Sequence, residues 1–401
     1  MKIKLLFYFF VISYINTILS KEIIIFNLQK NEMKINDINI YYKGKIHKKV
    51  NLIIDTMSFY TILKKENINS EIYKESNITY VANSYRSFSG RNSYISFIKS
   101  KKEKKLFPIS IFTMFNLRNK NIYLDLNKIN FDGIIGLALN YSSDVAVQDT
   151  FFFGEDKEYS IMNYIYEKKY INKNIFSIND NYFILGKLNL SHNINYCYCD
   201  DKLEFSYKYF FWNCWSKGIK IENRYFNINN VLILDSLIKG LIFPEKILLK
   251  LIDVINDYTK DKICYLFQNE FYCLLSLNLN SNLSIELKEN FNLNFKMKDL
   301  FYNYEINNTK ILKSIISSSK DSSTIIIGKL IYDYYFVEFD SENKKIGFSN
   351  FINLNNISKH FFYNNKTIIF NNKIIIIIIL FLITILFLGI IINLYIENYI
   401  R

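Results

Sequence analysis

Residues 51–56 read NLIIDT and residues 231–236 read VLILDS, so one short pattern occurs twice in the chain. In both copies an apolar run of strand-forming residues leads directly to an aspartate that is followed by a hydroxyl residue. Apolar and β-branched residues favour a buried strand, and small polar residues at its end favour a turn. The pattern therefore predicts two buried strands that each deliver an acid, Asp55 or Asp235, to a turn.

A second apolar stretch that ends in glycine follows each copy. Gly136 closes the run 131–136 in the first half, and Gly328 closes the run 325–328 in the second. Glycine lets another backbone approach closely, so each of these strands is expected to pass beside its aspartate turn. Two such units, related by approximate two-fold symmetry, would bring both acids to a lobe boundary, where clefts tend to form. The alternative is that both aspartates end ordinary strands and that the adjoining hydroxyls bond locally.

The composition favours a mainly β protein. The 401 residues include 35 Phe and 32 Tyr but only 11 Gly and 2 Pro. Aromatic residues favour strands, and the scarcity of Gly and Pro leaves the turns to Asn, Asp and Ser. The length between the two apolar ends suffices for two lobes. Residues 159–170 and 244–258 have apolar residues at helical spacing, which predicts one helix in each lobe.

Both ends of the chain contain apolar segments that favour a membrane. Residues 1–20 combine two early lysines with a short apolar run, which predicts a secretory signal peptide; an uncleaved signal anchor is the alternative. Residues 374–392 form an uninterrupted apolar run of the length that crosses a bilayer, which predicts a transmembrane helix. We therefore expect a membrane protein of the secretory pathway or cell surface, with a luminal or extracellular body. The other predicted parts are an N-terminal β lobe (21–185), a C-terminal β lobe (186–350), a stalk (351–373) and a cytosolic tail (393–401).

Charge, histidines and cysteines limit the partners that we expect. The formal net charge is +13, but the lysines are spread along the chain instead of forming a basic stripe, so we expect no nucleic-acid binding. The three histidines have no zinc-ligand spacing, so we expect no metal site. Five cysteines are too few for a fold built on disulfides. Cys264 and Cys273 are close enough in sequence to staple a hairpin, and buried free thiols are the alternative.

Taken together, these motifs resemble the pepsin-like aspartic proteases. The stalk and the apolar run near the C-terminus are similar to those of the membrane-anchored members of the plasmepsin group. The resemblance spans residues 40–350, and its most specific element is FDGIIGL at residues 131–137. Further matches lie, in the order typical of the family, at residues 174–177, 185–186, 324–328, 334–340 and 345–348.

The resemblance implies a mainly β, bilobal pepsin-like fold whose inter-lobe cleft takes a peptide or protein substrate and needs no cofactor. Asp55 and Asp235 would be the catalytic acids and would activate a water held between them. Thr56 and Ser236 would supply hydroxyls that brace the two loops. Tyr80 would be the tyrosine of a hairpin flap over the cleft.

The residues beside the acids depart from the family pattern. Met57 and Leu237 stand where the family has glycine, and Lys329 follows Gly328 where the family prefers aspartate. Lys239 stands where a small hydroxyl residue is usual. We expect the larger side chains to crowd the water and the substrate, and a lysine near the acids would favour two ionised carboxylates over a shared proton. The backbone N–H groups of residues 57 and 237 would remain available to the carboxylates.

Two functions therefore stay open. In the first, the chain is a membrane-anchored aspartic endopeptidase that cleaves peptide bonds with Asp55 and Asp235. In the second, it is a catalytically inactive pseudoprotease that acts as a membrane-displayed binding or scaffold module, because a fold can persist without its chemistry. A long inhibitory prosegment is not expected, because the first lobe begins soon after the signal peptide.

Overall fold

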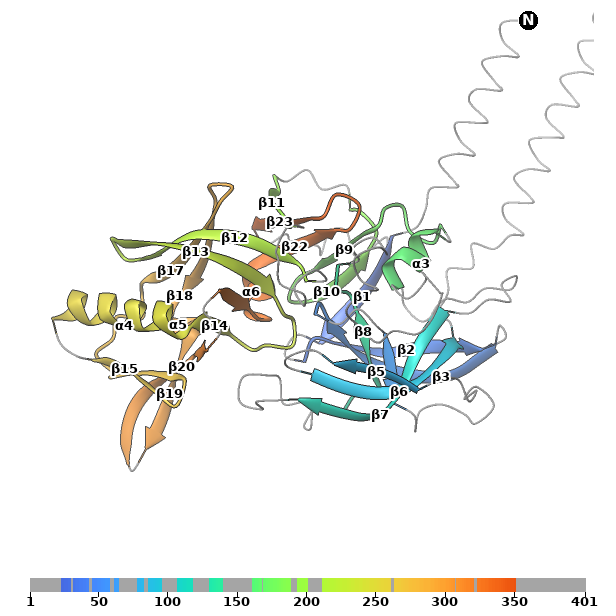
Figure 1. Ribbon diagram of the computed structural model, residues 1–401, viewed down its shortest axis with the longest axis horizontal. Coiled ribbons are helices and arrows are strands. Elements are labelled where there is room, and N and C mark those ends of the chain that lie inside the picture. Colours follow the sequence, from blue (N-terminus) through green and yellow to red (C-terminus); the bar gives the residue numbers. More distant parts are fainter. Residues whose placement is uncertain are drawn as a thin grey trace, which may run out of the picture.

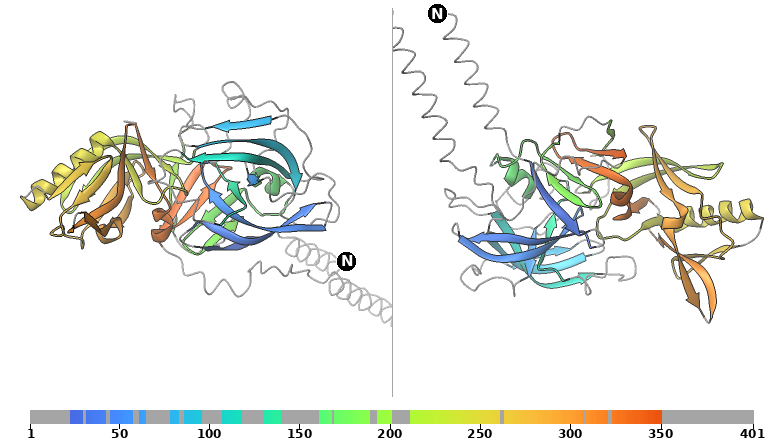
Figure 2. Two further views of the ribbon diagram at one scale, coloured as in Figure 1. Left: turned by 90° about the horizontal axis from the view of Figure 1, so that it is seen from below. Right: turned by 180° about the vertical axis from the view of Figure 1, so that it is seen from behind.

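We describe the fold from a computed structural model (Figures 1 and 2). The structure describes residues 23–29, 32–42, 45–57, 61–64, 78–82, 86–95, 107–117, 130–139, 161–167, 169–188, 193–200, 211–260, 263–306, 308–320 and 323–350. The predicted signal peptide, stalk, transmembrane helix and cytosolic tail lie outside these residues. Among the helices within them, none is long and apolar enough to cross a membrane.

The described chain is mainly β and bilobal, as the sequence predicted (Figure 1). In chain order its first elements are β1 (Ile24–Gln29), β2 (Lys34–Tyr42), β3 (Lys45–Asp55), β4 (Ile62–Lys64), β5 (Ile78–Ala82), β6 (Arg86–Ile95), β7 (Phe107–Leu117), β8 (Gly133–Gly136), α3 (Ile161–Glu167), β9 (Ile175–Ile178) and β10 (Tyr182–Leu185). The later elements are β11 (Asn195–Tyr198), β12 (Asn213–Ile221), β13 (Arg224–Leu234), β14 (Leu241–Pro244), α4 (Glu245–Thr259), β15 (Cys264–Phe267), β16 (Glu270–Cys273), β17 (Asn282–Leu287), β18 (Asn292–Lys296), α5 (Met297–Leu300), β19 (Phe301–Ile306), β20 (Thr309–Ser319), β21 (Thr324–Ile327), α6 (Leu330–Tyr334), β22 (Tyr335–Asp340) and β23 (Lys345–Asn350).

The sequence repeat corresponds to one strand arrangement that occurs in both lobes. In the first lobe β3 pairs in parallel with β8, β8 is antiparallel to β4, and β4 is parallel to β7. In the second lobe β13 pairs in parallel with β21, β21 is antiparallel to β14, and β14 is parallel to β20. Asp55 lies opposite Gly136, and Leu234, the residue before Asp235, lies opposite Ile327. In each lobe the strand that leads into a glycine therefore runs beside the strand that delivers the aspartate.

Gly328 shows why glycine follows the second of these strands. Its N–H donates to the carbonyl oxygen of Gly240 at 2.7 Å. A side chain at this position would collide with the carbonyl groups of Ile238 and Gly240. Glycine therefore allows the backbone after β21 to lie directly against the loop that follows Asp235.

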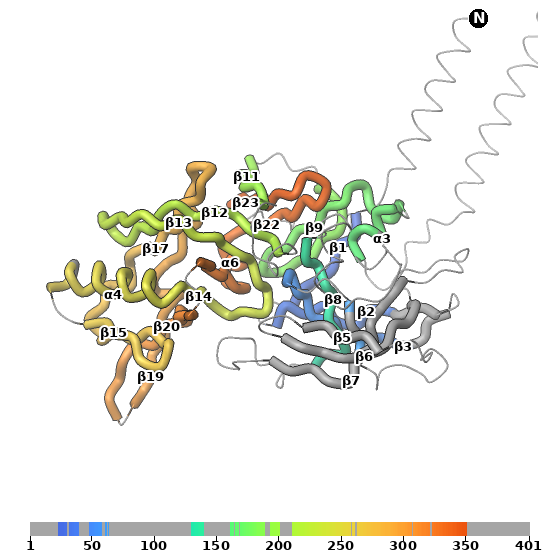
Figure 3. Tube along the Cα trace, viewed as in Figure 1, coloured from blue at the N-terminus to red at the C-terminus, as the bar shows by residue number. Residues whose placement is uncertain are grey.

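A further run of strands connects the two lobes. These strands follow the order β1, β10, β9, β22, β23 and β11, and every neighbouring pair is antiparallel. Although β22 and β23 come from the end of the described chain, they lie beside β9 and β11, as the orange-red and green tubes show in Figure 3. Both halves of the chain therefore contribute strands to one shared, hydrogen-bonded sheet.

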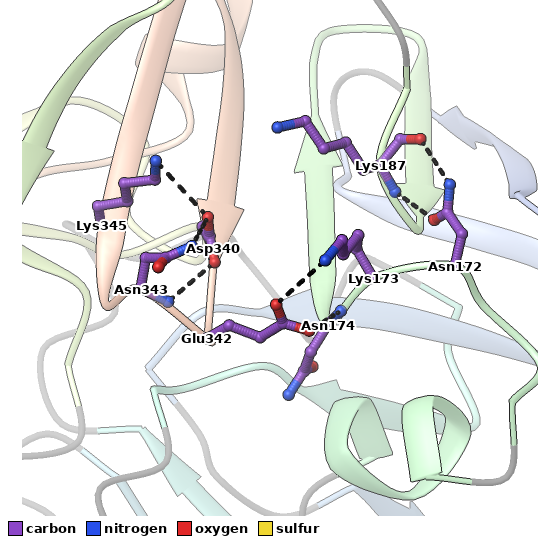
Figure 4. Close-up of polar contacts among 8 residues, drawn as sticks. All are labelled: Asn172, Lys173, Asn174, Lys187, Asp340, Glu342, Asn343 and Lys345. Carbon is purple, nitrogen blue, oxygen red and sulfur yellow. Dashed lines mark hydrogen bonds and ion pairs between the residues drawn. The ribbon is translucent and has the colours of Figure 1, made fainter.

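Polar contacts hold the turn between β22 and β23 against the segment before β9 (Figure 4). Asp340 accepts hydrogen bonds from the backbone N–H and the side-chain amide of Asn343, at 3.0 and 2.8 Å. Glu342 accepts a hydrogen bond from the N–H of Asn174 at 3.3 Å, and its carboxylate lies 3.8 Å from the ammonium group of Lys173. Because Glu342 and Asn174 come from opposite halves of the chain, these contacts stabilise the shared sheet at its edge.

Aromatic side chains fill the junction of the two halves. Phe176 of β9 stacks on Phe339 of β22 with ring centroids 4.5 Å apart, and Trp212 meets Phe339 edge-on at 5.1 Å. The indole N–H of Trp212 donates to the carbonyl of Leu137 at 2.6 Å, which satisfies its polar group inside the core. Since Leu137 directly follows β8, this bond ties the second half of the chain to the strand pair that carries Asp55.

The two predicted helices are present, and one of them covers the second lobe. α3 lies inside the predicted stretch 159–170, and α4 matches the stretch 244–258 to within one residue at each end. Pro244 precedes α4 as its N-cap residue, where its missing N–H costs no helical hydrogen bond. α4 packs buried residues such as Leu248 and Leu251 toward β14, β15 and β20, and it lies along the outside of the second lobe (Figures 1 and 2).

Two disulfides lie among the described residues. Cys264 of β15 and Cys273 of β16 are direct cross-strand partners and are joined, so this pair staples a hairpin instead of forming two free thiols. A second disulfide joins Cys197 of β11 to Cys214 of β12. The remaining thiol, Cys199, is buried, and burial raises its pKa to about 12. Because the thiolate is the reactive form, we expect Cys199 to be inert.

Strand β22 of the shared sheet carries two buried carboxyl groups, Glu338 and Asp340, and folding shifts the pKa of Glu338. The phenol of Tyr196 donates to one of its oxygens at 2.7 Å, and the other oxygen has no hydrogen-bond partner among the described atoms. Burial raises the pKa of Glu338, and the neighbouring charge of Asp340 acts in the same direction. The hydrogen bond from Tyr196 and the charges of Lys187 and Lys345 oppose this shift without cancelling it.

We predict that Glu338→Gln makes the stability of the protein less sensitive to rising pH. A carboxyl whose pKa is raised by folding stabilises the fold fully below its unfolded value of 4.5, and this contribution disappears as the pH rises through the folded value. Glutamine keeps an acceptor for Tyr196 but does not titrate. Thermal unfolding midpoints measured from about pH 4 to about pH 8 should show the variant gaining stability relative to wild type as pH rises. Glu305→Gln, at an exposed position of β19, is the control; equal pH dependence in wild type and Glu338→Gln would contradict the prediction.

Candidate active site

The two aspartates singled out by the repeat lie at equivalent places in the two lobes. Asp55 is the last residue of β3, and Asp235 directly follows β13. The strands β3 and β13 end in buried apolar residues, so the chain carries both side chains into the interior before it turns. Asp55 is 0% and Asp235 is 1% exposed. A carboxylate without compensating hydrogen bonds would be very costly at such a position.

Reciprocal hydrogen bonds join the two loops that carry the aspartates. The hydroxyl of Thr56 donates to the carbonyl of Leu234 and accepts from the N–H of Ser236, both at 3.0 Å. The hydroxyl of Ser236 donates to the carbonyl of Ile54 at 2.8 Å and accepts from the N–H of Thr56 at 3.0 Å. We call this set of four hydrogen bonds the hydroxyl brace. It links positions 180 residues apart and makes the two loops neighbours across the lobe boundary.

Each carboxyl group also has a donor within its own loop. The N–H of Met57 donates to Oδ1 of Asp55 at 2.9 Å, and the N–H of Leu237 donates to Oδ1 of Asp235 at 3.0 Å. These are the backbone N–H groups that the sequence predicted to remain available in spite of the missing glycines. The same geometry in both loops gives the two carboxyls matched orientations relative to the backbone.

The side chains that replace the family glycines have apolar neighbours. Leu237 is fully buried within the main hydrophobic core. Met57 is 3% exposed and packs with Phe211, Val231 and Ile233. Each side chain thus lies in a hydrophobic cluster while its N–H reaches the adjacent carboxyl. That the two side chains crowd the water and the substrate stays a prediction.

The two lysines near the site differ in their exposure. The side chain of Lys239 is exposed, whereas both carboxyl groups are buried. Lys329 is half-buried at the start of α6, and its backbone N–H donates to the carbonyl of Ile238 at 2.7 Å. The Lys329 backbone therefore helps to fix the loop that follows Asp235.

Tyr80 lies in a β-hairpin formed by β5 and β6. Its backbone is opposite Ser89 in an antiparallel pair. The side chain of Tyr80 is outside the described part of the structure, so its role as a flap residue stays a prediction.

One buried residue at the site was missed by the sequence reasoning. Tyr332 of α6 is 1% exposed, and the polar side chains that influence the pKa of its phenol are Thr56, Asp235 and Asp55. Burial raises its pKa above the ordinary range, the charges of Asp235 and Asp55 add to this, and the Thr56 side chain opposes it. The only signal in the sequence is a tyrosine four positions after Gly328, which by itself predicts nothing about the site.

Within the described ranges, no group of three or more His, Cys, Asp or Glu side chains is placed to hold a metal ion. The arrangement presents two carboxyl groups in buried, hydrogen-bonded loops. Carboxyl pairs of this kind can act as general acid and general base.

Comparison with known proteins gives a consistent result. A family model described as eukaryotic aspartyl protease matches residues 44–351. Among solved structures, the fold is similar to that of the aspartic proteinase from Irpex lacteus, with a TM-score of 0.59 and 12% sequence identity. That match covers 82% of this chain and 97% of the other. No curated protein matches the sequence.

We predict that Thr56→Val and Ser236→Ala each destabilise the protein by about 1–3 kcal/mol, because each leaves a buried N–H and a buried carbonyl without a partner. The loss in free energy of unfolding should be smaller in the double variant than the sum of the two single losses, by about 0.5 kcal/mol or more. The reason is that both hydroxyls hold the same two loops together. Denaturant unfolding of the four proteins measures this coupling. Thr259, whose hydroxyl bonds within α4 to the carbonyl of Ile255, supplies the control. Thr259→Val combined with Ser236→Ala should be additive, and additivity in the Thr56 cycle as well would contradict the prediction.

Proposed function

Because the chain belongs to the eukaryotic aspartyl protease family, we propose that it is an aspartic endopeptidase anchored in a membrane of the secretory pathway or cell surface. Asp55 and Asp235 are its catalytic acids, and a peptide or protein bound between the lobes is its substrate. The observation that carries this proposal is the hydroxyl brace, which joins the two aspartate loops by four hydrogen bonds.

The proposed reaction is general acid–base hydrolysis. Two carboxylates held close together repel each other, so one of them keeps its proton. The ionised carboxylate takes a proton from a water that lies between the pair, and this water attacks the carbonyl carbon of the scissile peptide bond. The protonated carboxyl donates to the carbonyl oxygen as the tetrahedral intermediate forms. Collapse of the intermediate passes a proton to the leaving amine, and neither a covalent enzyme intermediate nor a cofactor is needed.

Hydrogen bonds to the two carboxyls support this mechanism, and they are present although the residues beside the acids differ from the family pattern. Both carboxyls keep a backbone donor, from Met57 and from Leu237. Neither donor depends on glycine, because every residue except proline has a backbone N–H. Tyr80 is proposed as the flap residue, and the pairing of β5 with β6 supports a hairpin at that point. An extended peptide would be bound by strand-like hydrogen bonds, with side-chain pockets setting its preference.

The alternative function is a pseudoprotease that binds a partner without cleaving it. The near-complete burial of Asp55 and Asp235 favours this alternative, since a substrate must reach both groups. The two functions make opposite predictions for an assay of peptide cleavage.

Membrane anchoring is proposed from the apolar run 374–392, with residues 1–20 as the signal that brings the body across a membrane. The two disulfides support an oxidising compartment such as the secretory pathway.

Anchoring predicts a simple fractionation result. The full chain, expressed in a eukaryotic cell, should remain in the membrane pellet after extraction with alkaline carbonate. High pH weakens electrostatic contacts with a membrane surface but does not extract a transmembrane helix. A chain that ends at residue 350 should be recovered in the soluble luminal or secreted fraction. Release of the full chain by carbonate would contradict the proposal.

The catalytic proposal predicts that Asp55→Asn and Asp235→Asn each lower peptide cleavage at least about 100-fold, because each removes one member of the acid–base pair. Asparagine keeps the Oδ1 acceptor for the N–H of residue 57 or 237, so the fold should persist, and thermal unfolding checks this. The assay uses a diverse peptide pool at acidic to neutral pH, with Glu305→Gln as an exposed carboxylate control. Cleavage that survives in both aspartate variants would refute the assignment. A folded wild-type protein that cleaves no peptide would support the pseudoprotease.

A further inference from the structure

Tyr332 is held close to the aspartate loops by the backbone around Gly328. The N–H of Gly328 donates to Gly240, and the N–H of Lys329 donates to Ile238, each at 2.7 Å, so the start of α6 is bonded to the loop after Asp235. The N–H of Tyr332 continues this turn by donating to the carbonyl of Lys329 at 3.0 Å. Its side chain, 1% exposed, is therefore fixed inside the protein at the lobe boundary.

The phenolic oxygen of Tyr332 is buried and makes no hydrogen bond of normal geometry to the described atoms. A buried O–H without an acceptor is unfavourable, so it should turn toward the nearest acceptor that has a free lone pair. The polar groups that act on this phenol are the side chain of Thr56 and the carboxylates of Asp235 and Asp55. Burial together with these negative charges raises the pKa of Tyr332, so the phenol keeps its proton and remains a donor.

Thr56 can accept the hydrogen bond that Tyr332 offers. In the hydroxyl brace, the Thr56 oxygen donates to Leu234 and accepts from the N–H of Ser236. A hydroxyl oxygen has two lone pairs, so one of them is still available. α6 carries one acid, Asp333, and packs against β22, whose acids are Glu338 and Asp340. The charges that act on the Tyr332 phenol are those of Asp235 and Asp55.

We propose that Tyr332 is a positioning residue of the active site: its buried O–H supports the Thr56 side of the hydroxyl brace and favours the state in which one of the two carboxyls is ionised. This inference rests on the proposed function, since it assigns a role in the same reaction. Because the O–H of Tyr332 is directed at Thr56, it acts on the carboxyls through its dipole, and preoriented dipoles are effective where water is excluded. Because the phenol acts on Thr56, it also makes the surroundings of the Asp55 loop different from those of the Asp235 loop.

Tyr332→Phe tests the proposal, because it removes one oxygen and keeps the ring in the core. The acidic limb of the pH profile of kcat/KM should move to higher pH by about 0.5 unit or more. The reason is that the variant lacks the phenol that favours the singly ionised state of the two carboxyls. The value of kcat should fall while KM changes little. Replacement of Tyr332 by 3-fluorotyrosine, a stronger donor of nearly the same shape, should move the limb in the opposite direction.

Tyr334→Phe is the matched control on the same helix. The Tyr334 phenol bonds to Asp299 and accepts from the N–H of Lys296 at 3.0 Å, away from the aspartate loops. Loss of the Tyr334 hydroxyl should leave the pH profile of kcat/KM unchanged. An active wild type whose pH profile and kcat are unaltered by Tyr332→Phe would overturn the proposal and leave the proposed function intact.

A stability measurement keeps the two proposals separable if the wild type cleaves no peptide. The free energy of unfolding should be lower in Tyr332→Phe than in wild type at neutral pH, and the difference should shrink as acid protonates the carboxyls. A phenol with a purely structural role would give the same difference at every pH. That constant difference would overturn the role of Tyr332 whatever the outcome of the cleavage assay.

Discussion

The candidate site depends on one reciprocal interaction, the hydroxyl brace between the loops of Thr56 and Ser236. Each hydroxyl satisfies a backbone N–H and a carbonyl of the opposite loop, so neither loop can shift without leaving buried polar groups unpaired. This constraint keeps the loops that carry Asp55 and Asp235 next to each other across the lobe boundary. The parallel strand pairs place the two loops at the lobe boundary. The shared sheet and the hydrogen bond from Trp212 to Leu137 hold the two halves of the chain together.

The departures from the family pattern show which parts of such a site are replaceable. Met57 and Leu237 differ from glycine in their side chains, and those side chains lie in hydrophobic clusters. Their N–H groups still bond to the carboxyls. Gly328 is different, because a side chain there would collide with the backbone of the Asp235 loop. Glycine is thus retained where two backbones touch, whereas the positions beside the acids tolerate larger residues.

The sequence predicted the parts of the fold that have a local or repeated signal. The doubled apolar-strand and aspartate pattern predicted two equivalent strand pairs, and helical spacing predicted α3 and α4. The shared sheet could not be derived from the residues alone, because β22 and β23 pair with β9 and β11 without any local pattern that specifies those partners. Tyr332 was missed for the same reason: the polar groups that act on it come from the ends of β3 and β13 and the loops that follow them, which are distant in sequence.

The most direct test of this account is a crystal structure of residues 21–350 at acidic pH, with the distance between the carboxyl oxygens of Asp55 and Asp235 as the measurement. We predict that the closest pair of oxygens lies within hydrogen-bonding distance, about 3 Å, with the Thr56 and Ser236 hydroxyls bonded across the boundary. Carboxyl groups that lie well beyond that distance, with another side chain between them, would contradict the account.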